Sequence, residues 1–226
     1  GAGTTSLTVL KLLFDPGAVS APVRERPRIF EPYLTFIAVQ CVLFFINLPY
    51  LGAAIKAQMA TAAQGRPVPG TAVLVVFGLL GLIIVLALVL ALTGLILWVL
   101  ASVLGGSGEA KYSTLLSVAE YSAVPSVILL SIVGTIVLHM KGTAGLTSPQ
   151  DMQPALGLDL LMPGAKGFLG AVLKAVNPFS IWGLVLTAIG VSTTQRVSKG
   201  TGYTIATAAF VIGLLIAGAF GAIGNR

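Results

Sequence analysis

The sequence predicts an all-α protein, a polytopic membrane bundle of five transmembrane helices with short interfacial helices. Three observations predict it. Hydrophobic residues make up 56% of the 226 residues, and the mean hydropathy is +1.00. Charged residues make up only 9%, against about a quarter in an average soluble domain, which excludes a water-soluble globule. Five long apolar stretches each approach or exceed the roughly 20 residues that a helix needs to cross a bilayer.

The membrane domain is expected over residues 33–223. Its predicted spans lie at about 33–51, 72–104, 115–140, 179–195 and 203–223. The second span, uncharged throughout, would be about 50 Å long as a helix, so we expect it to tilt, kink or protrude. The fourth follows Asn177-Pro178, where asparagine suits the N-cap and proline the first helical position. Residues 179–195 are only just enough to cross a bilayer as a helix, so the fourth span is a minimal crossing.

Two segments outside the spans are also expected to be ordered. Residues 1–32 are predicted to form a cytoplasmic amphipathic arm, with a helix from Thr5 to Phe14 that stops at Asp15-Pro16-Gly17. The apolar side of this helix is formed by Leu7, Leu10, Leu13 and Phe14. Residues 141–178 form a predicted external loop. Within it, 165–176 carries an apolar stripe, typical of a helix on the membrane surface or of a loop helix that covers the spans.

The distribution of basic residues predicts the orientation. Seven lie on the side of the amino terminus and six on the other, where they are spread over longer loops. Because basic residues are retained on the cytoplasmic side, the amino terminus is expected in the cytoplasm and the carboxyl terminus outside. The Ala- and Gly-rich composition is compatible with a bacterial inner membrane.

The net charge of +6 favours a membrane surface as the partner, because the basic residues are scattered between apolar runs and form no nucleic-acid-binding patch. The candidate residues for binding lipids or a protein partner are Lys11, Arg24, Arg26 and Arg28. Near an anionic leaflet each contributes about 1 kcal/mol of binding. The alternative is that these residues only set the topology.

Glu120 is the first residue to weigh for chemistry, because a carboxylate within a span is costly and often functional. Ser117, Tyr121 and Ser131 accompany it as a candidate intramembrane polar site. Pro125 belongs to the same site, because it removes a hydrogen bond from the Tyr121 carbonyl. The favoured alternative is structural: Glu120 snorkels to the interface and pairs with a cation. The cations considered are Arg196, Lys199 and the amino-terminal arginines.

Small residues in the last span recur every four positions and predict a tight helix contact, either within the chain or in a homo-oligomer. They are Ala209, Gly213, Ala217 and Gly221. Four polar side chains are expected to form hydrogen bonds between helices, namely Gln40, Asn47, Thr93 and Thr187.

No catalytic, cofactor or metal site is expected, because one histidine, His139, and one cysteine, Cys41, supply too few reactive groups. His139 is expected at the interface, Cys41 in packing, and Gly105–Gly108 in a flexible turn. Phosphate-binding and nucleophile motifs are also missing from the sequence.

Four local motifs occur in an order that resembles the Yip family of five-span membrane proteins. They are Leu13-Phe14-Asp15-Pro16, Glu120-Tyr121-Ser122-Ala123-Val124-Pro125, Asn177-Pro178-Phe179-Ser180-Ile181-Trp182 with Gly190, and Ser198-Lys199-Gly200. The resemblance covers nearly the whole chain. It implies an all-helical membrane domain without known enzymatic chemistry, which in eukaryotes acts in trafficking and membrane shape and interacts with Rab-type GTPases. The arm of about 30 residues, which lacks the eukaryotic Asp-Leu-x-Gly-Pro signature, is similar to that of the bacterial branch.

The resulting functional hypothesis is a non-catalytic membrane protein that organises membrane or recruits lipids and partners through its basic arm. The alternative is a small transporter or channel with Glu120 as the coupling residue.

Overall fold

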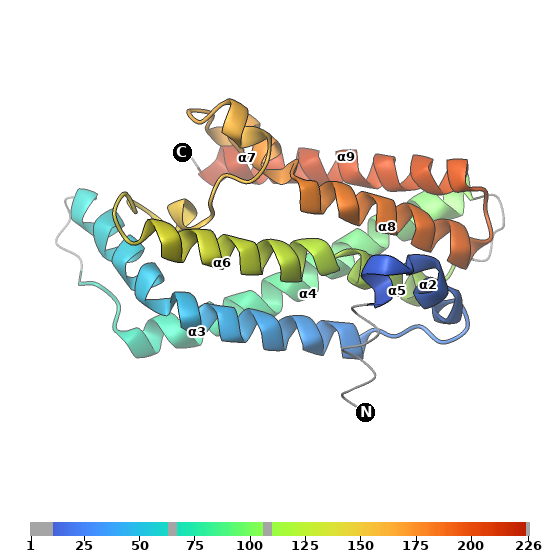
Figure 1. Cartoon of the computed structure of the whole chain (residues 1–226), viewed down its shortest axis with the longest axis horizontal. Helices are drawn as coiled ribbons and strands as arrows, with labels where there is room; N and C mark the ends of the chain where they lie inside the picture. The colour runs from blue at the N-terminus through green and yellow to red at the C-terminus, as the bar shows by residue number, and fades with distance from the viewer. Residues whose placement is uncertain (1–10, 63–66, 106–109, 225–226) are drawn as a thin grey trace. The chain divides into compact units, whose positions relative to one another are not determined.

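The computed structural model describes residues 11–62, 67–105 and 110–224, and every regular element within them is helical, which confirms the predicted fold class (Figure 1). The chain divides into two compact units. The first comprises residues 1–34, 87–126 and 155–226, and the second 35–86 and 127–154. Most of the predicted 5–14 helix lies outside the described residues, as does most of the Gly105–Gly108 turn. Residues 11–14 are helical, with Leu12 rather than Phe14 buried.

The described residues include four helices long and apolar enough to cross a membrane, or up to five if one bent pair forms a single span. The four are α3 (Phe30–Thr61), α4 (Thr71–Leu104), the broken helix Tyr112–Lys141 and α9 (Lys199–Gly224). The bent pair is α7 (Gly167–Ala175) and α8 (Pro178–Gln195), which meet at 63°. The predicted fourth span therefore exists as helix α8, but it is long and apolar enough to cross a membrane only when it is taken together with α7.

The second unit contains most of α3, the first part of α4 and α6 (Leu130–Lys141). Gln40 of α3 donates to the Ser131 hydroxyl of α6 at 2.9 Å, and Asn47 donates to the Thr135 hydroxyl at 2.9 Å. The later residue of α3, Asn47, is bonded to the later residue of α6, Thr135, so the two helices run parallel. Two parallel helices can be joined only if the chain between them runs back along their length. Helix α4 is long enough to make this return.

Two of the four predicted interhelical hydrogen bonds are thus confirmed, and two are wrong. The hydroxyls of Thr93 and Thr187 instead donate to Val89 and Gly183, the carbonyls four residues earlier in their own helices, at 2.8 Å each. A threonine hydroxyl that finds an acceptor within its own helix needs no second helix. The amides of Gln40 and Asn47 also find partners on α6.

Pro125 interrupts the third predicted span, as expected, and the interruption is a π-helical turn. α5 (Tyr112–Ser122) ends there, the turn η1 occupies Pro125–Leu129, and α6 follows. Proline cannot donate to a carbonyl one turn earlier, and a wider turn is one way for a helix to continue past it. In the second unit, Gln40 donates to the Val127 carbonyl of this turn at 2.6 Å, which supplies a partner for a widened backbone.

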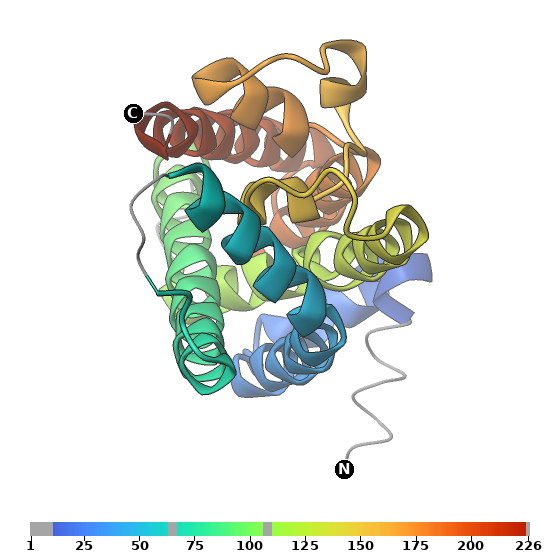
Figure 2. The same cartoon turned by 90° about the vertical axis from the view of Figure 1, so that its left-hand side faces the viewer.

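The first unit is built on a core shared by α4, α5, α8 and α9. Its buried members are Leu97, Ala101, Leu115, Val118, Ala119, Val191 and Ile205. The close approach of α8 and α9 depends on Gly202, where a Cβ would lie 2.6 Å from the Ala188 carbonyl oxygen. Both views show α7 beside the carboxyl-terminal part of α9 (Figure 1; Figure 2). There the Phe168 ring occupies the space that a side chain at Gly218 would need.

Helix α2 (Pro16–Val23) is absent from the sequence-based prediction, which places only a helix stop at Asp15-Pro16-Gly17. Asp15 is instead the N-cap of α2, accepting a hydrogen bond from the Ala18 amide at 3.2 Å, and Pro16 opens its first turn. The same two residues end one helix and begin the next. The predicted helix at 165–176 is confirmed as α7, and two short 3-10 helices, η2 (Pro149–Met152) and η3 (Leu158–Leu161), precede it.

Candidate functional site

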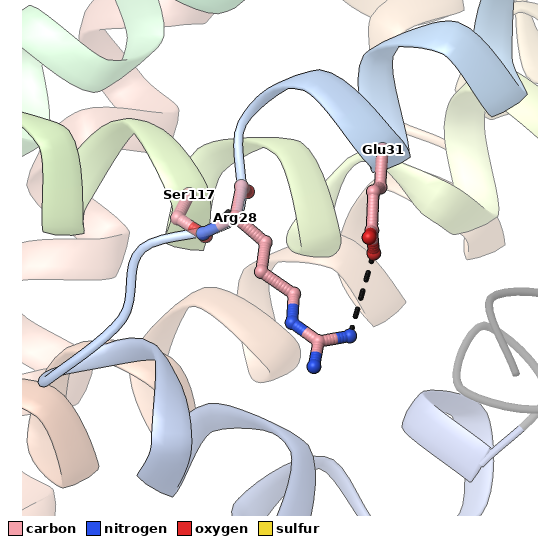
Figure 3. Close-up of polar contacts among 3 residues, drawn as sticks. All are labelled: Arg28, Glu31 and Ser117. Carbon is pink, nitrogen blue, oxygen red and sulfur yellow. Dashed lines mark hydrogen bonds and ion pairs between the residues drawn. The ribbon is translucent and has the colours of Figure 1, made fainter. Parts of the chain in front are cut away.

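The end of the amino-terminal arm is bound to α5 by the Ser117 side chain. The Arg28 amide donates to Ser117 Oγ at 3.2 Å, and that hydroxyl donates to the Arg28 carbonyl at 2.8 Å (Figure 3). Ser117 is completely buried. Residue 28 lies just before α3, outside any helix, so its peptide groups have no helical partners. The hydroxyl satisfies both groups and holds the arm at a defined position on α5.

Arg28 also forms an ion pair with Glu31, one turn into the chain that follows. The guanidinium lies 3.4 Å from the carboxylate, and both side chains are about half exposed (Figure 3). Exposed ion pairs contribute about 0 to 1 kcal/mol, so this pair orients Arg28 more than it stabilises the fold. Glu31 also lies in the first turn of α3, where a negative charge favours the helix dipole.

One face of α5 is polar and is directed toward the arm. Ser117, Glu120 and Tyr121 lie three and four positions apart, so they share a side of the helix. Ser117 binds residue 28, and the charged neighbours of Tyr121 are Arg28, Glu31 and Glu120. The arm segment around residue 28 therefore covers the face on which Glu120 lies.

Glu120 is buried, with 2% of its surface exposed, and its Oε2 has no hydrogen-bond partner in the described part of the chain. The expected snorkelling is wrong, because the neighbouring elements enclose the side chain. The expected ion pair is also not formed, since Glu120 takes part in no salt bridge among the described residues. A buried polar oxygen without a partner costs about 1–3 kcal/mol, and more if it is charged.

Helix α2 packs against α5 and α8 through Val19, Ser20 and Val23, which are all buried. Gly190 of α8 allows the close approach of α5, because a Cβ there would lie 2.8 Å from Val118 Cγ1, and Ser20 Oγ of α2 lies in ordinary contact at 3.7 Å from the same position. Arg24 follows at the carboxyl end of α2, and its Nη1 is buried without a hydrogen-bond partner among the described residues. Among the described residues of the first unit, two buried side-chain atoms thus lack a hydrogen-bond partner, the donor Arg24 Nη1 and the acceptor Glu120 Oε2.

The other candidate residues are distributed as follows. Lys11 and Arg26 are exposed, whereas Pro125 is buried in the π-helical turn. Ser131 belongs to the second unit, where it accepts the hydrogen bond from Gln40. The structure therefore brings together Ser117, Glu120, Tyr121 and the arm, and it gives Ser131 a different partner.

The small residues of the last span have different surroundings. Ala209 packs against the core of the first unit, and a Cβ at Gly221 would lie 2.5 Å from the Ala171 Cβ of α7. Gly213, in contrast, is exposed, with nothing within 4 Å of its Cβ position in the described structure, and Ala217 is half-buried. The predicted stripe is therefore in contact with other elements at Ala209 and Gly221 but not at Gly213, and Gly202 and Gly218, which lie outside the stripe, make two further close contacts of this helix.

No group of three or more His, Cys, Asp or Glu side chains that could hold a metal occurs within the described residues. The His139 ring lies against Tyr50, with centroids 4.5 Å apart, and its Nδ1 is 2.9 Å from the Thr135 carbonyl. Hydrogen bonds from Thr147 and Ser148 lower the pKa of the Asp151 carboxyl below its ordinary value, which stabilises the loop turn around η2.

Sequence reasoning missed α2 and the attachment of the arm to α5. A signal for the helix was present, because Asp15 followed by Pro16 is a typical N-cap and first position. Nothing in the local sequence identified residue 28 as the partner of Ser117, because the bond joins backbone atoms to a side chain 89 positions away.

Comparison with known proteins agrees with these features. The family model of the Yip1 domain matches residues 10–220. Membrane protein YknW of Bacillus subtilis (strain 168) is 27% identical over 223 residues, which cover 96% of this chain and 90% of that protein. No solved structure matches the chain. The family match extends from the arm through the last long helix, and the chain is a membrane protein that belongs to the Yip1 domain family.

Proposed function

We propose that this protein is a non-catalytic membrane protein that binds anionic lipid headgroups through its amino-terminal arm and so organises membrane or positions partners there. The observation that carries the proposal is the surface of the arm. Lys11, Arg26 and Arg28 are exposed, as are the aromatic side chains of Phe14 at 86% and Phe30 at 78%. Basic groups beside exposed aromatic rings suit the interface of an anionic leaflet.

The Ser117–Arg28 hydrogen bonds support this function, because they keep the basic residues close to the membrane domain. Three cations near an anionic surface supply about 3 kcal/mol of attraction, enough to hold a short arm on the bilayer. We place the protein in a bacterial inner membrane, with the amino terminus in the cytoplasm and the carboxyl terminus outside. The excess of basic residues on the amino-terminal side supports that orientation.

The test compares amide hydrogen exchange of residues 11–28 in vesicles of phosphatidylcholine with and without phosphatidylglycerol. In the native chain we expect the anionic lipid to increase protection of the arm. The triple variant Lys11→Gln/Arg26→Gln/Arg28→Gln should lose this response. The matched control, Lys141→Gln/Lys166→Gln/Lys174→Gln, removes three charges elsewhere and should retain it. Equal protection of the native arm in both lipid mixtures would refute the proposal.

A small transporter or channel is the second candidate, and the burial of Glu120 with an unpartnered Oε2 favours it. Intramembrane carboxylates are often relays for protons or cations. Proton flux into proteoliposomes, measured with an entrapped pH-sensitive dye, tests this function by comparing the native chain with Glu120→Gln. A flux that depends on Glu120 would replace the lipid-binding proposal, and no flux above empty vesicles would remove the transporter.

A further inference from the structure

We propose that the amino-terminal arm is a strap with a second, closed state, in which Arg24 and Glu120 form a buried ion pair. In the structure Glu120 is buried and Arg24 is half-buried, and the buried atoms Arg24 Nη1 and Glu120 Oε2 each lack a hydrogen-bond partner among the described residues. One is a donor with a positive charge and the other an acceptor. The Arg24 guanidinium can donate a hydrogen bond to the Glu120 carboxylate, so a small movement of the arm would give both groups a partner.

Two contacts on either side of Arg24 locate it over the Glu120 region. Four residues before it, Ser20 lies beside Gly190 at the point where Val118 also meets that glycine. Four residues after it, the backbone of residue 28 is bonded to Ser117. Ser117 and Val118 are adjacent on α5, so residues 20 to 28 arch over this part of the helix. Arg24 stands at the middle of the arch.

Glu120 is within reach of that position. It lies two residues beyond Val118 and three beyond Ser117, a rise of about 3 to 4.5 Å along α5. It also shares the face of α5 that Ser117 presents to the arm. On α2, Arg24 is one turn beyond the buried Ser20 and therefore continues the inward side of that helix.

Arg24 is the described arm cation best suited to this role. Arg28 is already paired with Glu31, and both Arg26 and Lys11 are exposed. Among the described residues of the arm, Arg24 alone has a buried guanidinium nitrogen without a partner. The closed state therefore requires only that the Arg24 side chain and its turn shift toward α5, while the Ser117 anchor stays in place.

The proposal predicts that the two residues act as a pair on the opening of the arm. Opening is measured by hydrogen exchange of residues 24–31 in neutral phosphatidylcholine nanodiscs, where no anionic lipid competes for Arg24. Arg24→Gln and Glu120→Gln should each speed exchange by about tenfold, and the double variant should be no faster than either single one. Arg26→Gln, two residues away and exposed, is the control and should leave exchange unchanged. Effects that multiply in the double variant would overturn the pairing.

A second measurement keeps the proposal testable if a charge-removing variant does not fold. In a Cys41→Ala background, Arg24→Cys/Glu120→Cys should be joined by a short bifunctional thiol reagent, whereas Arg26→Cys/Glu120→Cys should not. Absence of the Arg24–Glu120 cross-link, with both cysteines reactive in the denatured chain, would show that Arg24 does not approach Glu120. These tests need no anionic lipid, so they are independent of the lipid-binding proposal. The pairing of Arg24 with Glu120 can be refuted while lipid binding by the arm is confirmed, and lipid binding can be refuted while the pairing is confirmed.

Discussion

At the scale of single residues, Ser117 differs from those threonines whose hydroxyls bond only within their own helix. The hydroxyls of Thr93, Thr187 and Thr194 each donate to a carbonyl of their own helix, four residues earlier. Ser117 instead exchanges two hydrogen bonds with residue 28. Its neighbour Glu120 is buried by the same arrangement. One hydroxyl therefore holds the backbone of residue 28 on α5, in addition to the packing of α2 against the same helix.

Ser117→Ala should destabilise the protein by about 1–2 kcal/mol, because the amide and carbonyl of residue 28 would lose their partner in a partly buried site. The measurement is the free energy of unfolding in a denaturing-detergent titration. Ser113→Ala is the matched control, since Ser113 lies one turn earlier on α5 and is half-buried. Equal loss in the two variants would mean that the hydroxyl of Ser117 does not hold the arm.

At the scale of helices, the close contact between α8 and α9 depends on Gly202 of α9, which packs against the backbone of α8. Gly202 lies against the Ala188 carbonyl oxygen and the Ser192 Cβ, at 2.6 and 3.0 Å from a Cβ at this position. Van der Waals packing drives helix association in lipid, so such close contact is an important source of stability. Gly213, on the same helix, faces open space in the described structure.

Gly202→Ala should therefore destabilise the α8–α9 hairpin by about 1–3 kcal/mol, because the carbonyl of Ala188 cannot move without shifting α8. Gly213→Ala should cause no loss, and alanine favours the helix there. The thermal unfolding midpoint of each variant in detergent checks the pair. A comparable decrease for Gly213→Ala would indicate that the predicted four-residue stripe, rather than Gly202, forms the essential contact.

At the scale of the whole molecule, the number of crossings depends on α7 and α8. α8 has 18 residues and would be about 27 Å long, close to the hydrocarbon thickness of about 30 Å. It meets α7 at 63°, so the pair is either one broken span or a re-entrant segment. An odd number of crossings puts the two ends of the chain on opposite sides, and an even number puts them on the same side.

We expect five crossings, with Lys11 and Gly224 on opposite sides of the membrane. Single cysteines at these positions in a Cys41→Ala background would be labelled with a maleimide that does not cross membranes. Lys56→Cys, near the exposed end of α3, marks the side reached after the first crossing and should match Gly224→Cys. Labelling of Lys11→Cys and Gly224→Cys from the same side would make α7 and α8 re-entrant and reverse the proposed location of the carboxyl terminus.

Much of the helical organisation could be predicted from composition. For the site, the sequence identified individual residues but not the contacts between them. The uncharged run at 72–104 is α4 almost residue for residue, and Asn177-Pro178 begins α8 where expected. The first span was underestimated, because α3 continues through Pro49 to Thr61. Glu120 and Ser117 were identified as candidates, but the partners predicted for Glu120 were wrong. The direction of a side chain depends on packing that local patterns do not describe.

The amino-acid sequence by itself determined that this chain is a bundle of membrane helices of the Yip1 domain family. The physical reason is that apolar segments in lipid must satisfy their own peptide groups, and a helix does this within one continuous segment. Only the tertiary structure decided that the arm binds α5 through Ser117, that Glu120 Oε2 and Arg24 Nη1 are buried atoms without a hydrogen-bond partner among the described residues, and that Gly202 rather than Gly213 makes close contact. These features arise where segments distant in the chain meet, and the hydrogen bonds and free space available there depend on both segments.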